Sequence, residues 1–505
     1  MVTTMDTWLG PRHWGFAVWW RKVTAPLAAS ALLIFLFSGT RPLMDTSEAR
    51  YAETAREMAF EGHWLIPHLG GHPHLTKPPL TYWLVGASCR LFGQSEWAAR
   101  LPIGLAAVAT TLLTALVARS MFGGKAGILA AWLQGLALVP LAAANVVTTD
   151  TLLTMFELGF MWCGWQLLLA HKQERSLTAW QIGFWAFLGG AFMTKGPAGM
   201  VPLVALGLFA IAAWREVRFR PLCSLWGMLL FLAVVLPWPL AVLYRVPNAV
   251  SIWREEVITN VFEDINHDFP RWAFPLLLVF GSFPAVLGLL FVTFVPRKEA
   301  LVAQVRLAQL YLFFWVIVSL VILVAQKTRL PLYVLPLYPP LSVLGAHGFQ
   351  LWRSRHRPSW ERAARWAPVL VAAYAALFLS GKWYYSTTTD RRDAHRSFKG
   401  VAELIRKHLG AADAKPIVYT AEGRLGYGLM YYLQSSDLVR VGKKTPTGET
   451  LWPRTFGDVL ESTAPQTRPE FLLVERKKES RYVDMFFKNA DRVGTTPAYA
   501  VWKKR

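Results

Sequence analysis

Ionisable residues crowd the segment RPLMDTSEARYAETAREM (41–58), which directly follows an uncharged apolar run. Asp45 and Glu48 are carboxylates that can accept a proton from a hydroxyl or hold a cationic sugar substituent. Arg50 and the more distant Lys77 can hold an anionic lipid head group, Arg through a bidentate fork and Lys as a point charge. Bound phosphate becomes a competent leaving group once fixed cations meet its developing charge. The segment therefore predicts the transfer of a group from a phospholipid-type carrier.

The composition indicates a polytopic membrane protein. Of the 505 residues, 54% are hydrophobic and only 17% are charged, whereas soluble domains average about 25% charged residues. Apolar runs of about 17–25 residues recur between residues 24 and 382, and each is long enough to cross a bilayer. The net charge is +21, but Lys and Arg cluster in short loops between apolar runs, so we expect no nucleic-acid partner.

Six segments concentrate the Arg and Lys residues, and they set the expected orientation. They are the N-terminus, 119–125, 171–175, 215–220, 296–306 and 353–365. Placing all six in the cytoplasm requires about eleven crossings and puts the C-terminal tail on the opposite side from the N-terminus. The spans are expected near 24–40, 98–118, 126–144, 150–170, 178–193, 197–213, 223–244, 273–295, 307–325, 331–350 and 366–382. The remaining apolar piece, 78–93, is short and contains Arg90, so we expect it to lie along the interface or to be re-entrant.

Several short loops on the expected outer face carry an ionisable residue directly at a span end. These residues are Asp150, Lys195, Lys327 and Arg329. Each alone also fits a snorkelling side chain. Charges at membrane depth are costly and usually face a cavity lined by protein, so four of them on one face predict a cavity where acids and bases converge.

The loop between the first two spans, 41–97, has the spacing of an amphipathic helix. Four of its charged residues, Glu53, Arg56, Glu57 and Glu61, are interpreted as a solvated face. The same loop holds four histidines within twelve residues, His63, His68, His72 and His74. Imidazoles suit a divalent cation such as zinc, although loop-surface histidines are the commoner case; the sequence requires no cofactor.

The run DTSEARYAETAREMAFEGHWLIPHLGGHPHLTKPPLTYW (45–83) resembles the first outer loop of bacterial aminoarabinose transferases. These enzymes belong to the wider GT-C group, which takes sugars from polyprenyl phosphate. That loop typically has an acidic pair followed by x-R-Y-A-E, an R-E-M helix, G-x-W and K-P-P. MTKGP (193–197), RLPLYVLP (329–336) and Asp150 resemble later landmarks in the same order. The resemblance covers roughly residues 25–350 and implies an all-α GT-C membrane domain with about 11–13 transmembrane helices.

The resemblance and the span-end pattern together imply one site. Its expected members are the catalytic carboxylates Asp45, Glu48 and Asp150, the donor-phosphate residues Arg50, Lys77, Lys195, Arg329 and Tyr333, and the further cavity residues Tyr51, Tyr82 and Lys327. The family usually carries Asp directly before the Glu of the first motif, whereas Ser47 stands there in this chain. Asp45 and Glu48 are therefore both candidates for the key carboxylate, with Asp45 preferred.

The activity implied is transfer of 4-amino-4-deoxy-L-arabinose from undecaprenyl phosphate to a lipid A phosphate, at the periplasmic face of a bacterial inner membrane. A phosphate acceptor is already ionised and needs no general base, whereas a protein hydroxyl or a polysaccharide acceptor would need Asp45 or Glu48. A secondary transporter would share the spans, but it should show internally repeated halves, and this chain shows none.

The tail changes composition after the last span. VAELIRKHL (401–409) and GYGLMYYLQ (426–434) predict helices, and PIVYT (416–420), FLLVER (471–476) and AYAVWKK (498–504) predict strands. The sequence thus divides into a membrane domain over 1–382, which includes the loop 41–97, and a small periplasmic α/β domain over 383–505 that acts as a structural cover or in acceptor recognition.

Overall fold

The structure is a computed structural model that describes most of the chain. The described residues are 16–45, 47–169, 177–254, 269–292, 300–327, 329–409, 416–421, 426–435, 438–441, 470–476 and 490–504. The chain forms two compact units, each of which combines segments that are distant in sequence. Unit 1 contains residues 1–36, 75–81 and 101–379, and unit 2 contains 37–74, 82–100 and 380–505.

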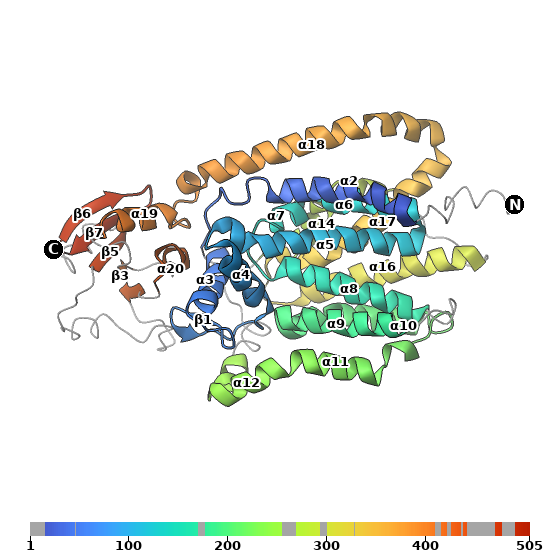
Figure 1. Ribbon diagram of the computed structural model, residues 1–505. Helices are drawn as coiled ribbons and strands as arrows, with labels where there is room; N and C mark the ends of the chain where they lie inside the picture. The colour runs from blue at the N-terminus through green and yellow to red at the C-terminus, as the bar shows by residue number, and fades with distance from the viewer. Residues whose placement is uncertain are drawn as a thin grey trace. The chain divides into compact units, whose positions relative to one another are not determined.

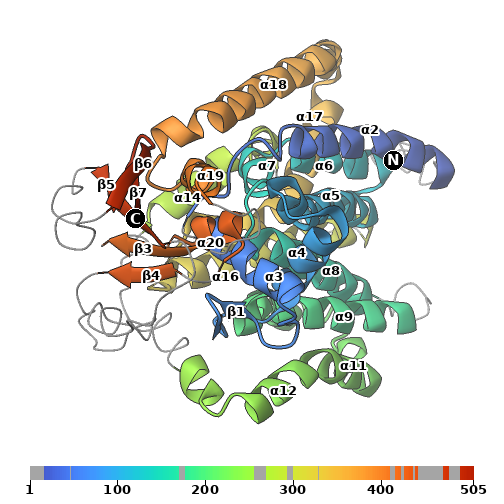
Figure 2. The same ribbon diagram turned by 60° about the vertical axis from the view of Figure 1, so that its left-hand side comes forward.

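Unit 1 is built from apolar helices that run side by side (Figures 1 and 2). Its helices are α2 (Phe16–Phe35), α5 (Glu96–Phe122), α6 (Gly124–Gly135), α7 (Leu138–Ala143), α8 (Asp150–Leu168), α9 (Thr178–Lys195), α10 (Val201–Ala212), α11 (Leu225–Val235), α12 (Pro237–Arg245), α14 (Ala273–Gly281), α15 (Ala285–Leu289), α16 (Ala300–Ala325), α17 (Tyr338–Arg355) and α18 (Arg357–Arg392), with 3-10 turns η3 (Gly196–Met200), η4 (Arg220–Leu222) and η5 (Pro331–Leu337). Helices α5 and α18 continue into unit 2.

The helical form follows from the apolar composition, because a backbone in lipid must satisfy its own hydrogen bonds. Five stretches within the described residues are long and apolar enough to cross a membrane: Glu96–Phe122, Thr178–Ala212, Leu225–Arg245, Ala303–Ala325 and Arg357–Thr389. All eleven predicted spans fall on helical segments. The chain is a multi-pass membrane protein, as predicted.

The way the ends of α8, α9 and α10 pair with one another agrees with the predicted membrane topology. At one end of these helices, Asp150 contacts Lys195. At the other end, the backbone N–H of Arg218 donates to the carbonyl of Leu168 at 3.0 Å. The predicted outer loops that adjoin Asp150 and Lys195 therefore lie at the same end of unit 1.

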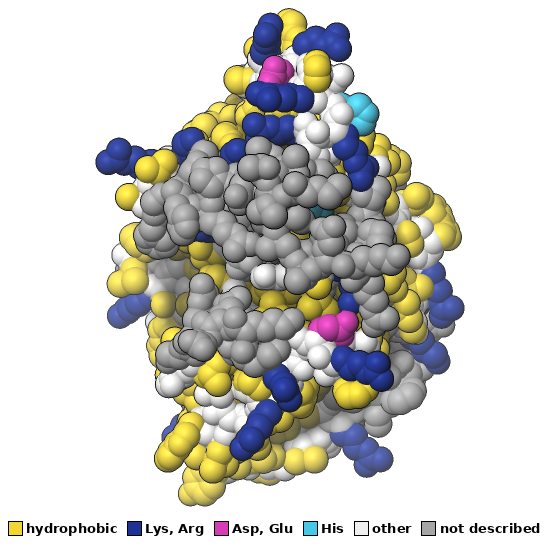
Figure 3. All heavy atoms as spheres, turned by 90° about the vertical axis from the view of Figure 1, so that its right-hand side faces the viewer, with side chains coloured by type: hydrophobic (Ala, Val, Ile, Leu, Met, Phe, Trp, Pro, Cys, Tyr) yellow, Lys and Arg dark blue, Asp and Glu magenta, His cyan; other side chains and the backbone are white. Residues whose placement is uncertain are grey.

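Several of the predicted basic segments lie close to one another. The positive charges of Lys22 and Arg353 lie close enough to Lys125 to repel it, and Arg306 pairs with Glu216 at 2.8 Å. Figure 3 views the side at which α2 begins, where Lys and Arg predominate among the described charged side chains. The basic segment 171–175 lies outside the described residues.

Tight packing holds the helices of unit 1 together. Tyr311 packs its ring against Trp165 at a centroid distance of 5.2 Å and donates its hydroxyl to the carbonyl of Met161 at 2.6 Å. A Cβ at Gly345 would lie 2.5 Å from the carbonyl oxygen of Ala285, so α15 and α17 touch through their backbones. Small residues permit such close approach, which drives helix association in lipid.

Unit 2 contains the first outer loop and the C-terminal sheet. Its elements are α3 (Ser47–Phe60), β1 (His68–Leu69), β2 (His72–Pro73), α4 (Leu80–Phe92), α19 (Lys399–Lys407), β3 (Ile417–Ala421), α20 (Tyr427–Leu433), β4 (Leu438–Val441), β5 (Glu470–Glu475), β6 (Ala490–Thr495) and β7 (Tyr499–Lys504). The five-stranded sheet has the order β4-β3-β5-β7-β6, with β3 parallel to β4 and β5 and the other pairs antiparallel. Every predicted tail element is present; β4 and β6 were not predicted.

Polar contacts bind the first outer loop to the tail. The Leu43 amide donates to the Tyr432 hydroxyl at 2.8 Å, and that hydroxyl donates to Glu96 at 3.1 Å. Lys399 on α19 pairs with the same Glu96 at 2.7 Å. Residues 41–74 and 82–97 of the loop therefore form one unit with the tail, and residues 75–81 belong to unit 1, whereas the sequence placed the whole loop with the membrane domain and divided the chain after residue 382. Helix α4 has 13 residues, too few for a full crossing, in line with the interfacial segment predicted there.

Candidate active site

Asp150 and Lys195 form an ion pair at the ends of two neighbouring helices in unit 1. Asp150 begins α8 and Lys195 ends α9, positions where the helix dipole favours an acid and a base respectively. Lys195 Nζ lies 2.5 Å from Asp150 Oδ1 and 4.0 Å from the centroid of the Tyr333 ring. The side chains of Lys195 and Asp150 are only 11% and 10% exposed. The structure thus brings together three of the predicted site residues.

The segment Lys77-Pro78-Pro79, called the KPP segment, passes beside this ion pair. Gly196 follows Lys195 with a φ of +63°, in the left-handed region that favours glycine. A Cβ at Gly196 would lie 3.9 Å from Cγ of Pro78. Lys77, which precedes Pro78, is half-buried and belongs to the same unit, so a second predicted cation lies in this part of unit 1.

Arg329 is held by backbone carbonyls. Its Nε donates to Phe269 at 3.0 Å and its Nη1 donates to Gln326 at 2.6 Å, and the residue is buried. These bonds fix the turn that leads into η5, which carries Tyr333. Lys327 is exposed. The predicted phosphate role of Arg329 and the predicted cavity role of Lys327 remain predictions.

Glu157 is a further acid near the Asp150–Lys195 pair that the sequence reasoning missed. It lies on α8 and is 3% exposed, and its carboxyl interacts electrostatically with both Lys195 and Asp150. Its spacing of seven residues from Asp150, which places both on one helix face, was the signal available in the sequence.

In unit 2, two arginines surround the carboxylate of Glu48. Arg41 Nη2 lies 2.7 Å from Oε2, Arg100 Nε lies 2.9 Å from Oε1, and the Met44 amide donates to Oε2 at 3.1 Å. Burial alone would raise the pKa of Glu48, but the charges of Arg100 and Arg41 outweigh it and hold this pKa below its ordinary value. Glu48 is therefore an ionised carboxylate with both oxygens engaged.

Arg100 organises the chain before Glu48, and sequence reasoning missed it because it falls inside the predicted second span. It is 2% exposed. Besides Glu48, it donates to the carbonyls of Ser38, Arg41 and Pro42 at 2.6, 2.7 and 3.1 Å. One guanidinium thus holds the turn that connects the first span to α3.

Asp45 caps a helix of the tail. Its carboxylate accepts the amides of Tyr427 at 3.1 Å and Gly428 at 2.8 Å, at the start of α20. Its backbone exchanges hydrogen bonds with Arg396, since the Asp45 amide donates to the Arg396 carbonyl and Arg396 Nε donates to the Asp45 carbonyl. Asp45 is fully buried. These contacts give it a structural role, so the preference for Asp45 over Glu48 as the catalytic carboxylate finds no support in this geometry.

Arg50, Tyr51 and Tyr82 lie close together in unit 2. The Tyr51 and Tyr82 rings stack at a centroid distance of 5.5 Å, and Arg50 Cζ lies 5.7 Å from the Tyr51 centroid. Both tyrosines are buried, whereas Arg50 is half-buried. The predicted phosphate role of Arg50 and the predicted cavity roles of Tyr51 and Tyr82 remain predictions.

The interpretation of Glu53, Arg56 and Glu57 as a solvated face is wrong. All three are at most 2% exposed. Arg56 forms a bidentate pair with Glu53 at 2.8 Å, and it also pairs with Glu61. Glu57 accepts the amides of Gly70 and Gly71 in the β1–β2 turn. Helix α3 has charged residues at helical spacing, yet nearly all of its side chains between Glu48 and Ala59 are buried.

The four histidines do not form a recognisable metal site. His63 and His68 stack their rings at a centroid distance of 3.9 Å, and His74 contacts Tyr82 edge-on. Within the described part of the chain, no group of three or more His, Cys, Asp or Glu side chains is arranged to hold a metal ion.

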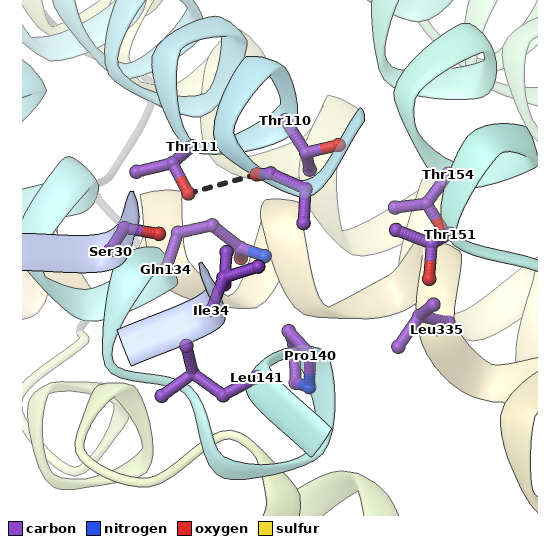
Figure 4. A pocket seen from close by; sticks show the side chains of 11 residues that line it. Ser30, Ile34, Thr110, Thr111, Gln134, Pro140, Leu141, Thr151, Thr154 and Leu335 are labelled. Atoms are coloured by element: carbon purple, nitrogen blue, oxygen red, sulfur yellow. Dashed lines mark hydrogen bonds between the residues drawn. The ribbon is translucent and has the colours of Figure 1, made fainter. Parts of the chain in front are cut away.

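A pocket with both apolar and polar lining lies beside α8 in unit 1 (Figure 4). Including its opening, it contains about 340 Å³ of empty space. Its polar lining consists of Ser30, Thr110, Thr111, Gln134, Thr151 and Thr154. Thr154 donates its hydroxyl to the carbonyl of Asp150 at 2.8 Å, so the first turn of α8 carries both the pocket lining and the ion pair.

The sequence is similar to known transferases. Residues 76–240 match the family described as dolichyl-phosphate-mannose-protein mannosyltransferase. The undecaprenyl phosphate-alpha-4-amino-4-deoxy-L-arabinose arabinosyl transferase of Yersinia enterocolitica is 29% identical over 63% of this chain and 57% of the relative. The protein of that name from Pseudomonas savastanoi pv. phaseolicola is 30% identical over 63% of this chain and 60% of the relative. The chain thus spans less than two thirds of the length of these relatives.

Solved structures share the fold over nearly the whole chain. The structure of ArnT from Cupriavidus metallidurans bound to undecaprenyl phosphate has a TM-score of 0.75 at 20% identity and covers 95% of this chain and 97% of that one. The Archaeoglobus fulgidus oligosaccharyltransferase has a TM-score of 0.55 at 12% identity, over 94% and 71%. The chain therefore has the predicted GT-C fold of ArnT, and its resemblance to the aminoarabinose transferases is confirmed.

Proposed function

We propose that the protein is an integral membrane glycosyltransferase that moves 4-amino-4-deoxy-L-arabinose from undecaprenyl phosphate to a lipid A phosphate. The proposal rests on the buried Asp150–Lys195 ion pair. The Lys195 ammonium lies against the face of the Tyr333 ring, and the pair is next to the KPP segment. The names of the sequence relatives supply the donor sugar, and undecaprenyl phosphate is bound to the ArnT structure of the same fold.

In the proposed reaction, the bond between the sugar C1 and the carrier phosphate breaks, and a bond forms between C1 and an acceptor oxygen. Undecaprenyl phosphate leaves with the electron pair and the additional negative charge. Lys195 and Lys77 meet this charge, since fixed cations in a water-poor site stabilise it better than water does. Asp150 positions the Lys195 ammonium. The amphipathic Tyr333 ring lies over that ammonium and covers it from solvent.

The burial and the hydrogen bonds of the Asp45 and Glu48 carboxylates favour a phosphate acceptor over a hydroxyl acceptor. A hydroxyl must lose its proton to a general base within hydrogen-bond reach. Asp45 and Glu48 are 0% and 2% exposed, and both oxygens of each carboxylate already accept hydrogen bonds. A phosphate acceptor is already ionised and needs neither residue.

Mass spectrometry of the acceptor tests the proposal. Lipid A from cells that express the protein should carry an added aminopentose, and lipid A from cells that lack it should not. Purified protein in liposomes should perform the same transfer from the undecaprenyl-phosphate-linked sugar. Unmodified lipid A together with a changed glycoprotein or polysaccharide would instead assign the hydroxyl-directed reaction.

The proximity of several basic segments supports a cytoplasmic N-terminus and a periplasmic tail, by the positive-inside rule. Cys223 offers a direct test, because it is exposed beside η4, whereas Cys89 and Cys163 are buried. A membrane-impermeant maleimide should label Cys223 only after the inner membrane is permeabilised. In a Cys223→Ser background, Lys407→Cys on exposed α19 should be labelled in intact spheroplasts. The reverse pattern would invert the proposed orientation.

A further inference from the structure

Glu157 is a buried acid on α8, about two helical turns after Asp150. Seven residues correspond to about two helical turns, so Glu157 and Asp150 lie on the same face of α8. Glu157 is 3% exposed, and the charges of Lys195 and Asp150 both act on its carboxyl. Among the described residues, none donates a hydrogen bond to this carboxyl. It is therefore an ionisable group that the packing of unit 1 leaves without a direct partner.

The three groups do not balance in charge. Two carboxylates and one ammonium sum to −1 when all are ionised, and Lys195 is already committed to Asp150 at 2.5 Å. An uncompensated charge inside a membrane domain is expensive. Lys195 and Asp150 are the charged groups that act on Glu157, and these three groups reach neutrality with one more positive charge, which is either a proton on Glu157 or a cation brought by a ligand.

We propose that Glu157 receives the ammonium group of the donor sugar and makes the site selective for a charged amino sugar over a neutral one. This inference rests on the proposed function. On binding, the proton of the Glu157 carboxyl passes to water and the sugar ammonium takes its place, so the total charge of the cluster does not change. A neutral sugar leaves the proton in place and gains no ion pair. Glu157 is a specificity-determining residue in this scheme and takes no part in bond breaking.

A purely structural role for Glu157 predicts a different result. In that case its carboxyl would only fill space between helices, and an isosteric amide would change stability without changing the choice of sugar. The difference between two donors, measured in one variant, separates these roles because any loss of stability affects both donors alike.

The experiment uses undecaprenyl phosphate carrying either 4-amino-4-deoxy-L-arabinose or L-arabinose, in which a hydroxyl replaces the ammonium group. Binding of each lipid to the purified full-length protein is followed by tryptophan fluorescence, and turnover gives KM and kcat separately. Wild type should bind the amino sugar donor about tenfold or more tightly than the arabinose donor, or about 1.4 kcal/mol. Glu157→Gln should bring the two affinities together and raise KM for the amino donor far more than it lowers kcat.

Matched controls make each outcome decisive. Glu216→Gln removes a carboxylate that pairs with Arg306 at the basic end and should keep the wild-type preference. An equal preference in Glu157→Gln and wild type overturns the inference, as does a wild type that does not prefer the amino donor. If neither lipid binds to wild type, the proposed function itself fails, and the inference fails with it.

Discussion

Replacement of Lys195 by alanine is expected to lower kcat/KM by at least about 10²–10³, because the site loses a fixed cation that meets the charge of the departing phosphate. The ammonium has a fixed position at the end of α9, where Nζ lies 2.5 Å from Asp150 Oδ1 and 4.0 Å from the centroid of the Tyr333 ring. Steady-state turnover of the undecaprenyl-phosphate-linked amino sugar measures the effect.

Loss of Lys195 also leaves the Asp150 carboxylate without this partner, which destabilises a buried site. The double variant Asp150→Asn with Lys195→Ala removes both charges, so it should regain thermal stability without regaining turnover. Lys125→Ala, at the basic end of unit 1, is the matched control and should retain normal turnover. Wild-type rates in a folded Lys195→Ala protein would remove this pair from the active site.

Replacement of Arg100 by alanine is expected to cost about 3–5 kcal/mol of folding free energy, as for other buried ion pairs that lose one partner. The change removes the Nε contact with Glu48 and the bonds to the carbonyls of Ser38, Arg41 and Pro42. Thermal unfolding of the detergent-solubilised protein measures the loss. Arg90→Ala, at an exposed position on α4, should unfold within about 0.5 kcal/mol of wild type.

The same cluster gives a pH dependence with a definite sign. Burial opposes ionisation of Glu48, but Arg100 and Arg41 hold its pKa below the ordinary value of 4.5. Its ionised form therefore stabilises the folded state above pH 4.5, and this contribution is lost as the pH falls below that value. Glu48→Gln should flatten this acid-side decline. An unchanged decline in the variant would show that other carboxyls govern it.

The helices were predictable because hydrophobic length and charge position suffice for them. Each predicted span falls on a helical segment. The charges at span ends grouped Asp150 with Lys195, and the family resemblance added Tyr333. Helical periodicity also placed α3, but it could not reveal that Glu53, Arg56 and Glu57 are covered, because periodicity describes one helix and not what packs against it. The short strands β4 and β6 lack a pattern that distinguishes them from loops.

Asp45 shows a second limit of sequence reasoning. Its position beside Glu48 suggested chemistry, but its side-chain partners lie more than 380 positions away, at the start of α20. Nothing in the local spacing indicates such a contact. Arg100 was missed for a related reason, since an arginine near the start of an apolar run is usually assigned to the membrane interface.

The distance along the chain between Asp45 and α20 has a consequence for biosynthesis. The Tyr427 amide is made 382 positions after Asp45, which takes roughly 20–75 s at 5–20 residues per second. During that interval the loop that carries Asp45 has already been made, while the α20 amides that Asp45 caps do not yet exist. The Asp45 carboxylate must stay hydrated until Tyr427 and Gly428 have left the ribosome, so the outer loop reaches its final form only after the helices of unit 1 have been made. A nascent chain stalled before residue 427 should therefore hold this loop open to proteases that the finished protein resists.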